Sequence, residues 1–298
     1  IVPDITMAAS PNAVILTGAK PVFVDIEEES LCLDVNKVAQ AINKKTKAVM
    51  HVSLNGRSGE LLKLKKLCQK KKIYLIEDAA QSLGSFYQGK HLGRHGIIGS
   101  FSFSMPKIIT TGQGGCLITD SQKLDEKIKL IKDFGRRRGG VDFYEKIGWN
   151  FKFTDLSAVI GIEQMKKLKT RIRKKKATFG LYRKLLANIP EVKFIKTNLK
   201  ETSPWFVDIL VSQREKLIVF LKESGVGSRP IYPALHSQPA YAKTSTFALR
   251  ASADKSAGKR ACPTAEKIAK QGLWLPSSVN LTEKQIKYIC QKIKDFYL

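Results

Sequence analysis

Hydrophobic and polar positions along the first part of the chain predict strands and helices in turn. Short apolar runs with the length and β-branched content of buried strands occupy residues 21–26, 47–54 and 73–80. Residues 35–43 and 60–72 have the hydrophobic spacing of amphipathic helices, and Asp34 stands where an N-cap is needed. This order predicts a mainly parallel sheet covered by helices on both faces, with ligands at the carboxyl ends of its strands.

The pattern changes past the middle of the chain. Two shorter strands are predicted at 99–104 and 115–120, followed by a helix over 124–134 and a long helical stretch over 155–189 that begins at Thr154 as N-cap. After Pro190, strands and helices mix with a proline-rich loop, as in an α+β lobe. We therefore predict a large domain over residues 1–165, and connecting helices with a small C-terminal domain over 166–298.

Composition narrows the class of protein. The net charge of +26 raises the possibility of nucleic-acid binding, but lysines are spread along the chain, and runs such as 63–72 and 166–176 fall where helices expose a solvated face. We therefore expect no specific nucleic-acid function. No apolar run reaches 18 residues, so no membrane anchor is expected. The five cysteines are far apart and form no Cys-x-x-Cys pair, which favours a reducing, cytoplasmic setting and no metal site.

Candidate chemistry gathers at two predicted strand ends. Asp78 ends the strand IYLIED, Gln81 follows three residues later, and Lys107 lies in the loop after GSFSFS, with Ser102 on that strand. A carboxylate and a lysine at neighbouring strand ends can form a simple ion pair. The alternative is a pyridoxal phosphate (PLP) site, in which the amine condenses with an aldehyde, the carboxylate keeps a pyridine nitrogen protonated, and hydroxyls bind phosphate.

Six blocks in order decide between these alternatives. They are VPDITMAASPNAVILTGAKPVFVDI, IEDAAQSLGSFYQGKHLG, GSFSFSMPKIITTGQGGCLITD, GWNFKFTDLSAVIGIEQM, SRPIYPALHSQPAY and GLWLPSSVNLTEKQI. Together they resemble the DegT/StrS family of PLP-dependent nucleotide-sugar aminotransferases over essentially the whole chain. The resemblance implies an α/β protein of PLP-dependent transferase fold type I (aspartate aminotransferase-like) and a homodimer with shared active sites.

Carried over by position, the resemblance gives each residue a role. Lys107 is implied as the Schiff-base lysine, Asp78 as the partner of the pyridine nitrogen and Gln81 as the neighbour of the phenolic oxygen. Ser102 is implied to hold the phosphate, and Asn150 to reach the phosphate of the neighbouring subunit's cofactor. A turn or cap residue is the alternative reading of Asn150, and Gln81 and Ser102 keep similar structural alternatives.

The resemblance also implies a reaction. Glutamate would donate an amino group to a nucleotide-linked 4-keto-6-deoxy sugar, and the closing block and TTGQGG loop look most like the perosamine-synthase type, which acts on GDP-4-keto-6-deoxymannose. Such a product serves amino-sugar and surface-glycan biosynthesis, such as that of lipopolysaccharide O-antigen. The alternatives are a different dTDP- or UDP-linked ketosugar, aminated at C3 or C4, and an inactive PLP-fold protein that binds or regulates. Family members carry a phosphate-binding Ser-Gly-Thr turn ahead of VPDITM, and we expect cofactor affinity to depend on such a segment.

Other polar residues are candidates for the same site. His236 resembles a family position on the sugar-binding side, and Tyr232 is close to it in the sequence; substrate contact and ordinary loop packing are the alternatives. His51 is expected to be a partly buried, hydrogen-bonded histidine, and His91 and His95 are expected on the surface beside a hairpin. The arginines at 136–138 could meet a diphosphate, but a solvated loop is the stronger expectation.

Overall fold

A four-stranded sheet organises the first part of the chain. The computed structural model describes residues 1–242, 245–246 and 262–298. The strands stand in the order β3, β4, β7, β8, where the first three are parallel and β8 is antiparallel to β7. Their bounds are β3 Ala48–Val52, β4 Tyr74–Asp78, β7 Ile98–Ser102 and β8 Gly115–Ile118. The carboxyl ends of β4 and β7 therefore lie side by side.

A second, three-stranded parallel sheet adjoins the first. It contains β1 (Val2–Pro3), β2 (Val22–Val24) and β12 (Ser245–Thr246), with β2 in the middle. Ile1 connects it to β3, since its amino group donates to the Ala48 carbonyl (2.9 Å) and its carbonyl accepts from Met50 N (2.9 Å). A short antiparallel hairpin, β5 (Phe86–Tyr87) and β6 (Lys90–His91), follows β4 in the chain.

Helices cover both faces of the main sheet because its side chains alternate. Val49 and Leu75 point to one face and pack in a buried cluster with residues of α2 (Val35–Ala41) and α3 (Leu61–Lys70). Met50 and Ile76 point to the other face, where they line cavities together with residues of α1 (Ala9–Leu16). Asp34 caps α2 by accepting from Asn36 N (2.8 Å) and Lys37 N, as its position in the sequence predicts.

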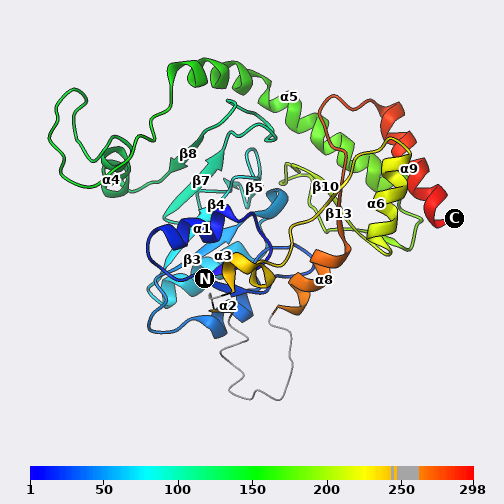
Figure 1. Cartoon of the computed structure of the whole chain (residues 1–298), viewed down its shortest axis with the longest axis horizontal. Helices are drawn as coiled ribbons and strands as arrows, with labels where there is room; N and C mark the ends of the chain where they lie inside the picture. Colours follow the sequence, from blue (N-terminus) through cyan, green and yellow to red (C-terminus); the bar gives the residue numbers. More distant parts are fainter. Residues whose placement is uncertain (243–244, 247–261) are drawn as a thin grey trace.

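A 31-residue helix, α5 (Asp155–Leu185), connects this sheet to the C-terminal lobe (Figure 1). Thr154 caps it by accepting from Ser157 N, which confirms the predicted N-cap. Before it, α4 (Gln122–Lys132) and the chain that follows extend away from the main sheet (Figure 1).

The C-terminal lobe holds an antiparallel sheet in the order β11, β13, β10, β9. Its strands are β9 Val192–Phe194, β10 Val207–Val211, β11 Arg229–Pro230 and β13 Gly272–Leu275. One face packs against the C-terminal half of α5 and against α6 (Arg214–Glu223) and α9 (Glu283–Tyr297). The remaining elements are the short helices η1 Leu54–Gly56, η2 Leu235–Ser237 and η3 Pro239–Tyr241, and α8 Pro263–Gln271.

The two lobes share a buried contact surface. Leu210 and Trp274 of the C-terminal sheet pack in one cluster with Ile5 and Leu54 from the first lobe. Beside this cluster, Arg57 forms a two-pronged ion pair with Asp208 of β10, with nitrogen–oxygen distances of 2.6 and 3.1 Å. Both apolar and charged contacts therefore hold the two lobes together.

Three histidine expectations are wrong in detail. His95 is buried, because its backbone N donates to Glu77 of β4 (2.5 Å). His91 is half-buried, because its ring contacts Phe101 of β7 and accepts from Gly84 N (2.8 Å). His51 is fully buried and neither ring nitrogen has a hydrogen-bond partner, so burial lowers its pKa to about 4. The domain boundary near residue 165 falls inside α5, and the division itself stays a prediction.

Candidate active site

The carboxyl ends of β4 and β7 open into a cavity of about 310 Å³. Four predicted residues line it, namely Asp78, Gln81, Ser102 and Lys107. Two come from the sheet and two from the turns that follow its strands, which is where parallel sheets place ligands. The loop after β1 and the start of α1 supply the opposite wall, including Thr6, Met7 and Ser10.

Asp78 is held as an acceptor at the end of β4. Ser10 Oγ donates to Oδ2 (2.7 Å) and Ala80 N donates to Oδ1 (3.1 Å). Each carboxylate oxygen has more than one lone pair, so Asp78 can still accept from a ligand. Ser10 was missed by sequence reasoning, because nothing in a serine on an apolar helix shows that it faces a strand 68 residues away.

Lys107 lies in the turn after β7, where its N–H donates to the Ser104 carbonyl (3.1 Å). Burial lowers the pKa of its amine to about 8, and the nearby Asp78 carboxylate opposes this shift. Its Nζ lies 3.7 Å from the centre of the Trp205 ring. A lowered pKa leaves more of this amine neutral near neutral pH than in an exposed lysine, and the neutral amine is the nucleophilic form.

Gln81 connects the cavity to the C-terminal lobe. Its Oε1 accepts from Asn55 N (2.9 Å), and its Nε2 donates to the Tyr232 hydroxyl (3.4 Å). Burial raises the pKa of Tyr232 to about 12, so this hydroxyl stays protonated. Ser102 Oγ shares a hydrogen bond with Ser104 Oγ (3.1 Å), and both hydroxyls line the cavity. Ser102 Oγ also accepts from Ser104 N (3.3 Å), and both hydroxyls can still turn to donate to an anionic ligand.

The structure places His236 and Asn150 outside this cavity. His236 Nδ1 lies 2.6 Å from Asp4 Oδ2, and its backbone N donates to Asp4 Oδ1 (2.8 Å). These bonds raise the pKa of His236. One donor atom each from Asp4, His236 and Cys262 lies within 4.8 Å of the others, but both Asp4 oxygens already accept hydrogen bonds from His236. Asn150 is exposed and pairs with Asp133 in the extended segment between α4 and α5 (Figure 1).

A second cavity, of about 600 Å³, opens on the other side of Lys107. It lies between the lobes, with Trp205, Phe206 and Trp274 among its walls. Its described lining includes four cations and no acidic side chain. These cations are Lys107, Arg171, Lys175 and Arg229. The cavity therefore favours anionic ligands.

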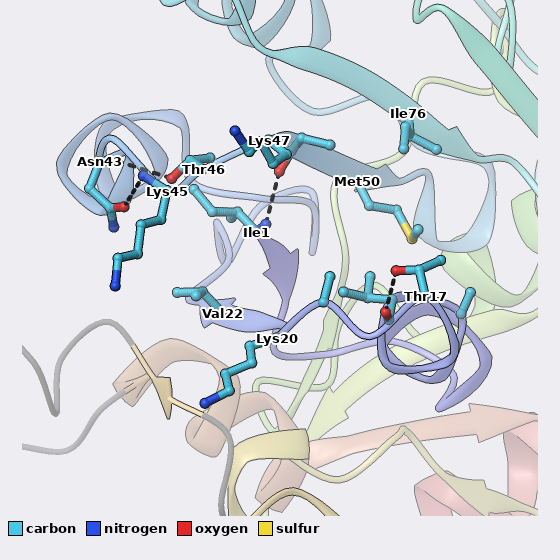
Figure 2. Close-up of a pocket in the computed structure, with 14 residues that line it drawn as sticks. Ile1, Thr17, Lys20, Val22, Asn43, Lys45, Thr46, Lys47, Met50 and Ile76 are labelled. Carbon is cyan, nitrogen blue, oxygen red and sulfur yellow. Dashed lines mark hydrogen bonds between the residues drawn. The ribbon is translucent and has the colours of Figure 1, made fainter.

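A third cavity, of about 590 Å³, lies on the Met50 and Ile76 face of the sheet (Figure 2). It shares Met50, Ile76 and Ala13 with the first cavity. Its walls carry no titratable pair like that of Asp78 and Lys107 within the described chain.

A PLP molecule fits the residues of the first cavity. A carboxylate with spare acceptor capacity faces the same space as a lysine whose amine is partly neutral, and two hydroxyls stand beside them. Met7, half-exposed, lines the wall where a ring face can be covered.

No described helix is long and apolar enough to span a membrane.

Comparison with known proteins shows the family to which the chain belongs. The family model of the DegT/DnrJ/EryC1/StrS aminotransferases matches residues 1–294. GDP-perosamine synthase of Vibrio cholerae is 34% identical over 302 residues, covering 100% of this chain and 79% of that protein. The enzyme of the same name from Escherichia coli O157:H7 is 32% identical, covering 100% and 78%. The solved structure of PseC from Helicobacter pylori, an aminotransferase involved in the biosynthesis of pseudoaminic acid, has a TM-score of 0.89 at 25% identity, covering 99% of this chain and 78% of that one.

Proposed function

Because the chain belongs to the DegT/DnrJ/EryC1/StrS family of PLP-dependent aminotransferases, we propose that it transfers an amino group from glutamate to a nucleotide-linked 4-keto-6-deoxy sugar. The favoured acceptor is GDP-4-keto-6-deoxymannose, because two relatives at 32–34% identity bear the name GDP-perosamine synthase. The observation that carries the proposal is the meeting of Asp78 and Lys107 in one cavity beside a second, cationic cavity.

Five residues would hold the cofactor. Lys107 would attach to it, Asp78 would bind its ring nitrogen, Gln81 would lie by its phenolic oxygen, and Ser102 would bind its phosphate. Asn150 of a second subunit would complete the phosphate site. When bound, PLP supplies an aldehyde and a ring that accepts electrons. Asp78 supports this because a negative charge next to a pyridine nitrogen favours its protonated form.

Lys107 would also move the proton that amino transfer requires. Its Nζ takes a proton as a neutral amine and later returns it as an ammonium group. A pKa near 8 suits both proton uptake and proton release near neutral pH, because the neutral amine and the ammonium form are both populated. The rate should therefore rise with pH toward about 8.

The cationic cavity between the lobes is the proposed entry for both substrates. Glutamate carries two carboxylates and a nucleotide sugar carries a diphosphate, and both are anions that Arg171, Lys175 and Arg229 attract. Tyr232 and its bond to Gln81 place a protonated hydroxyl at the border of the cofactor cavity. His236 is proposed to act from the loop that carries Tyr232, near the sugar.

We further propose that the enzyme works as a homodimer. The segment from 143 to 165 carries an unusual density of apolar side chains that are more than half exposed. They are Phe143, Tyr144, Ile147, Trp149, Phe151, Leu156, Val159, Ile162 and Met165. Exposed apolar surface of this extent marks an interaction site. Asn150 lies in the same segment, so in a dimer formed through this segment Asn150 of one copy would reach the cofactor phosphate site of the other copy. The five cysteines form no disulfide, which is consistent with the proposed cytoplasmic location.

The test supplies ¹⁵N-glutamate and PLP with GDP-4-keto-6-deoxymannose and follows ¹⁵N in the sugar nucleotide by mass spectrometry. The account expects label in the GDP-linked product and none with Lys107→Ala. Parallel reactions with dTDP- and UDP-linked 4-keto sugars identify a different acceptor. PLP binding without transfer to any of the three would indicate instead a PLP-fold binding protein.

A further inference from the structure

An indole ring lies directly against the amine of Lys107. The distance from Nζ to the centre of the Trp205 ring is 3.7 Å, which is well inside the range of a cation–π contact. Trp205 lies in the loop just before β10, 98 residues after Lys107, and only 5% of it is exposed. The resemblance and the comparisons give this residue no role.

The ring is fixed from two sides. Its indole N–H donates to the carbonyl of Pro106 (2.6 Å), the residue before Lys107. Its own backbone carbonyl accepts from the buried amine of Lys175 (2.5 Å), which also bonds to the Ser277 carbonyl (2.5 Å). Trp205 also contacts Phe206, with ring centres 4.0 Å apart. A ring held in this way keeps its face toward Nζ without further loss of side-chain freedom.

The Trp205 ring face contacts the Lys107 amine directly, whereas the Asp78 carboxylate acts on that amine through its charge without forming an ion pair. Within the described chain, no carboxylate oxygen lies within the 4.0 Å of an ion pair with Nζ. The charged groups that share its two cavities come from three elements: Asp78 at the end of β4, Arg171 and Lys175 of α5, and Arg229 of β11. Of these four, Asp78 is the group whose charge acts on the Lys107 amine, and it raises the pKa of that amine; the three cations line only the second cavity.

We propose that the Trp205 ring holds the protonated Lys107 amine by a cation–π contact. Trp205 is therefore a positioning residue for proton transfer by Lys107. The inference rests on the proposed aminotransfer, because that reaction requires Nζ to exist as a free amine during each turnover. When neutral Nζ takes a proton, an N–H bond forms, a C–H bond of the substrate breaks, and the electron pair remains on the substrate side. The negative face of the indole then stabilises the ammonium group at the point where the two cavities meet.

The test measures the pKa of Lys107 in the cofactor-free protein. Acetic anhydride labels the neutral amine, and mass spectrometry of the peptide containing Lys107 gives the labelling rate against pH. The variants are Trp205→Leu, which removes the ring, and Trp205→Phe, which keeps a ring face but loses the bond to Pro106. Trp274→Leu is the matched control, because Trp274 lines the same cavity without contacting Lys107.

The pKa of Lys107 should fall by about one unit in Trp205→Leu and by no more than a few tenths in Trp205→Phe and Trp274→Leu. An unchanged pKa in Trp205→Leu, or an equal fall in both Trp205 variants, would overturn the proposal. Protein grown with increasingly fluorinated tryptophan keeps the ring's shape and provides a second test. The pKa should fall with each added fluorine, but not in Trp205→Phe grown in the same way. These measurements use neither cofactor nor substrate, so their outcome is separate from that of the aminotransfer assay.

Discussion

The ion pair between Arg57 and Asp208 provides the sharpest test of how the two lobes are held together. Both side chains are at most 3% exposed, and the two nitrogen–oxygen distances are 2.6 and 3.1 Å. Asp208→Asn would keep the shape of the side chain and leave the Arg57 charge buried without its partner. Breaking a buried pair from one side costs about 3–5 kcal/mol.

The structure favours the lower end of this range. Arg57 Nε still donates to the Ser30 carbonyl (2.8 Å), and Nη1 still lies 3.5 Å from Thr197 Oγ1, so part of the guanidinium stays satisfied. We therefore expect a loss of about 3 kcal/mol. With a urea slope of about 3 kcal/mol per M for a chain of this size, the unfolding midpoint should fall by about 1 M.

Urea unfolding followed by circular dichroism and tryptophan fluorescence measures this change. The matched control is Lys196→Met, because the Lys196–Glu29 pair also connects the lobes but is exposed on both sides. Its midpoint should not move measurably. The double variant Arg57→Met with Asp208→Leu should recover much of the loss, because it leaves no buried charge. If Asp208→Asn behaved like Lys196→Met, the reasoning about this pair would be refuted.

Three further predictions follow from the site and the extended segment. Burial lowers the pKa of Lys175 from 10.5 to about 8, so between these pH values the unfolded chain binds more protons than the folded chain. Lys175 should therefore make the free energy of unfolding rise from about pH 8 to about pH 10. Urea titrations at each pH measure this rise, and Lys175→Met should remove it. Ile147→Glu, at a side chain that is 84% exposed, should shift the protein from dimer to monomer in light scattering after size exclusion without changing its circular dichroism; an unchanged dimer would exclude this segment as the interface. Ser10→Ala removes the 2.7 Å bond to Asp78 and should weaken PLP binding about tenfold in a fluorescence titration, while Ser237→Ala should leave it unchanged.

The local pattern of the sequence predicted most of the elements. The strands that became β2, β3, β4 and β7 stand within about three residues of their predicted bounds, because short apolar runs between amphipathic helices have few other solutions. The caps at Asp34 and Thr154 are confirmed for the same local reason. The predicted order of the strands also places Asp78 and Lys107 at the carboxyl ends of neighbouring strands, as the structure has them.

Long-range contacts account for what was missed. Ser10 and Trp205 reach the site from elements 68 and 98 positions away from the residues they touch, and neither carries a local signal of its role. His51 and His95 were misjudged because burial depends on which segments pack above them. The pairing of β12 with β2 is another long-range contact that the local sequence pattern does not predict.

The central claim is that Lys107 and Asp78 make a PLP site. Its most direct test is to add PLP to the purified chain, fix any covalent bond with borohydride, and locate the added mass by mass spectrometry. The account predicts a reduced PLP adduct on Lys107 alone among the 40 lysines, and weaker binding in Asp78→Asn. An adduct spread over surface lysines, or one that persists equally in Lys107→Ala, would contradict it.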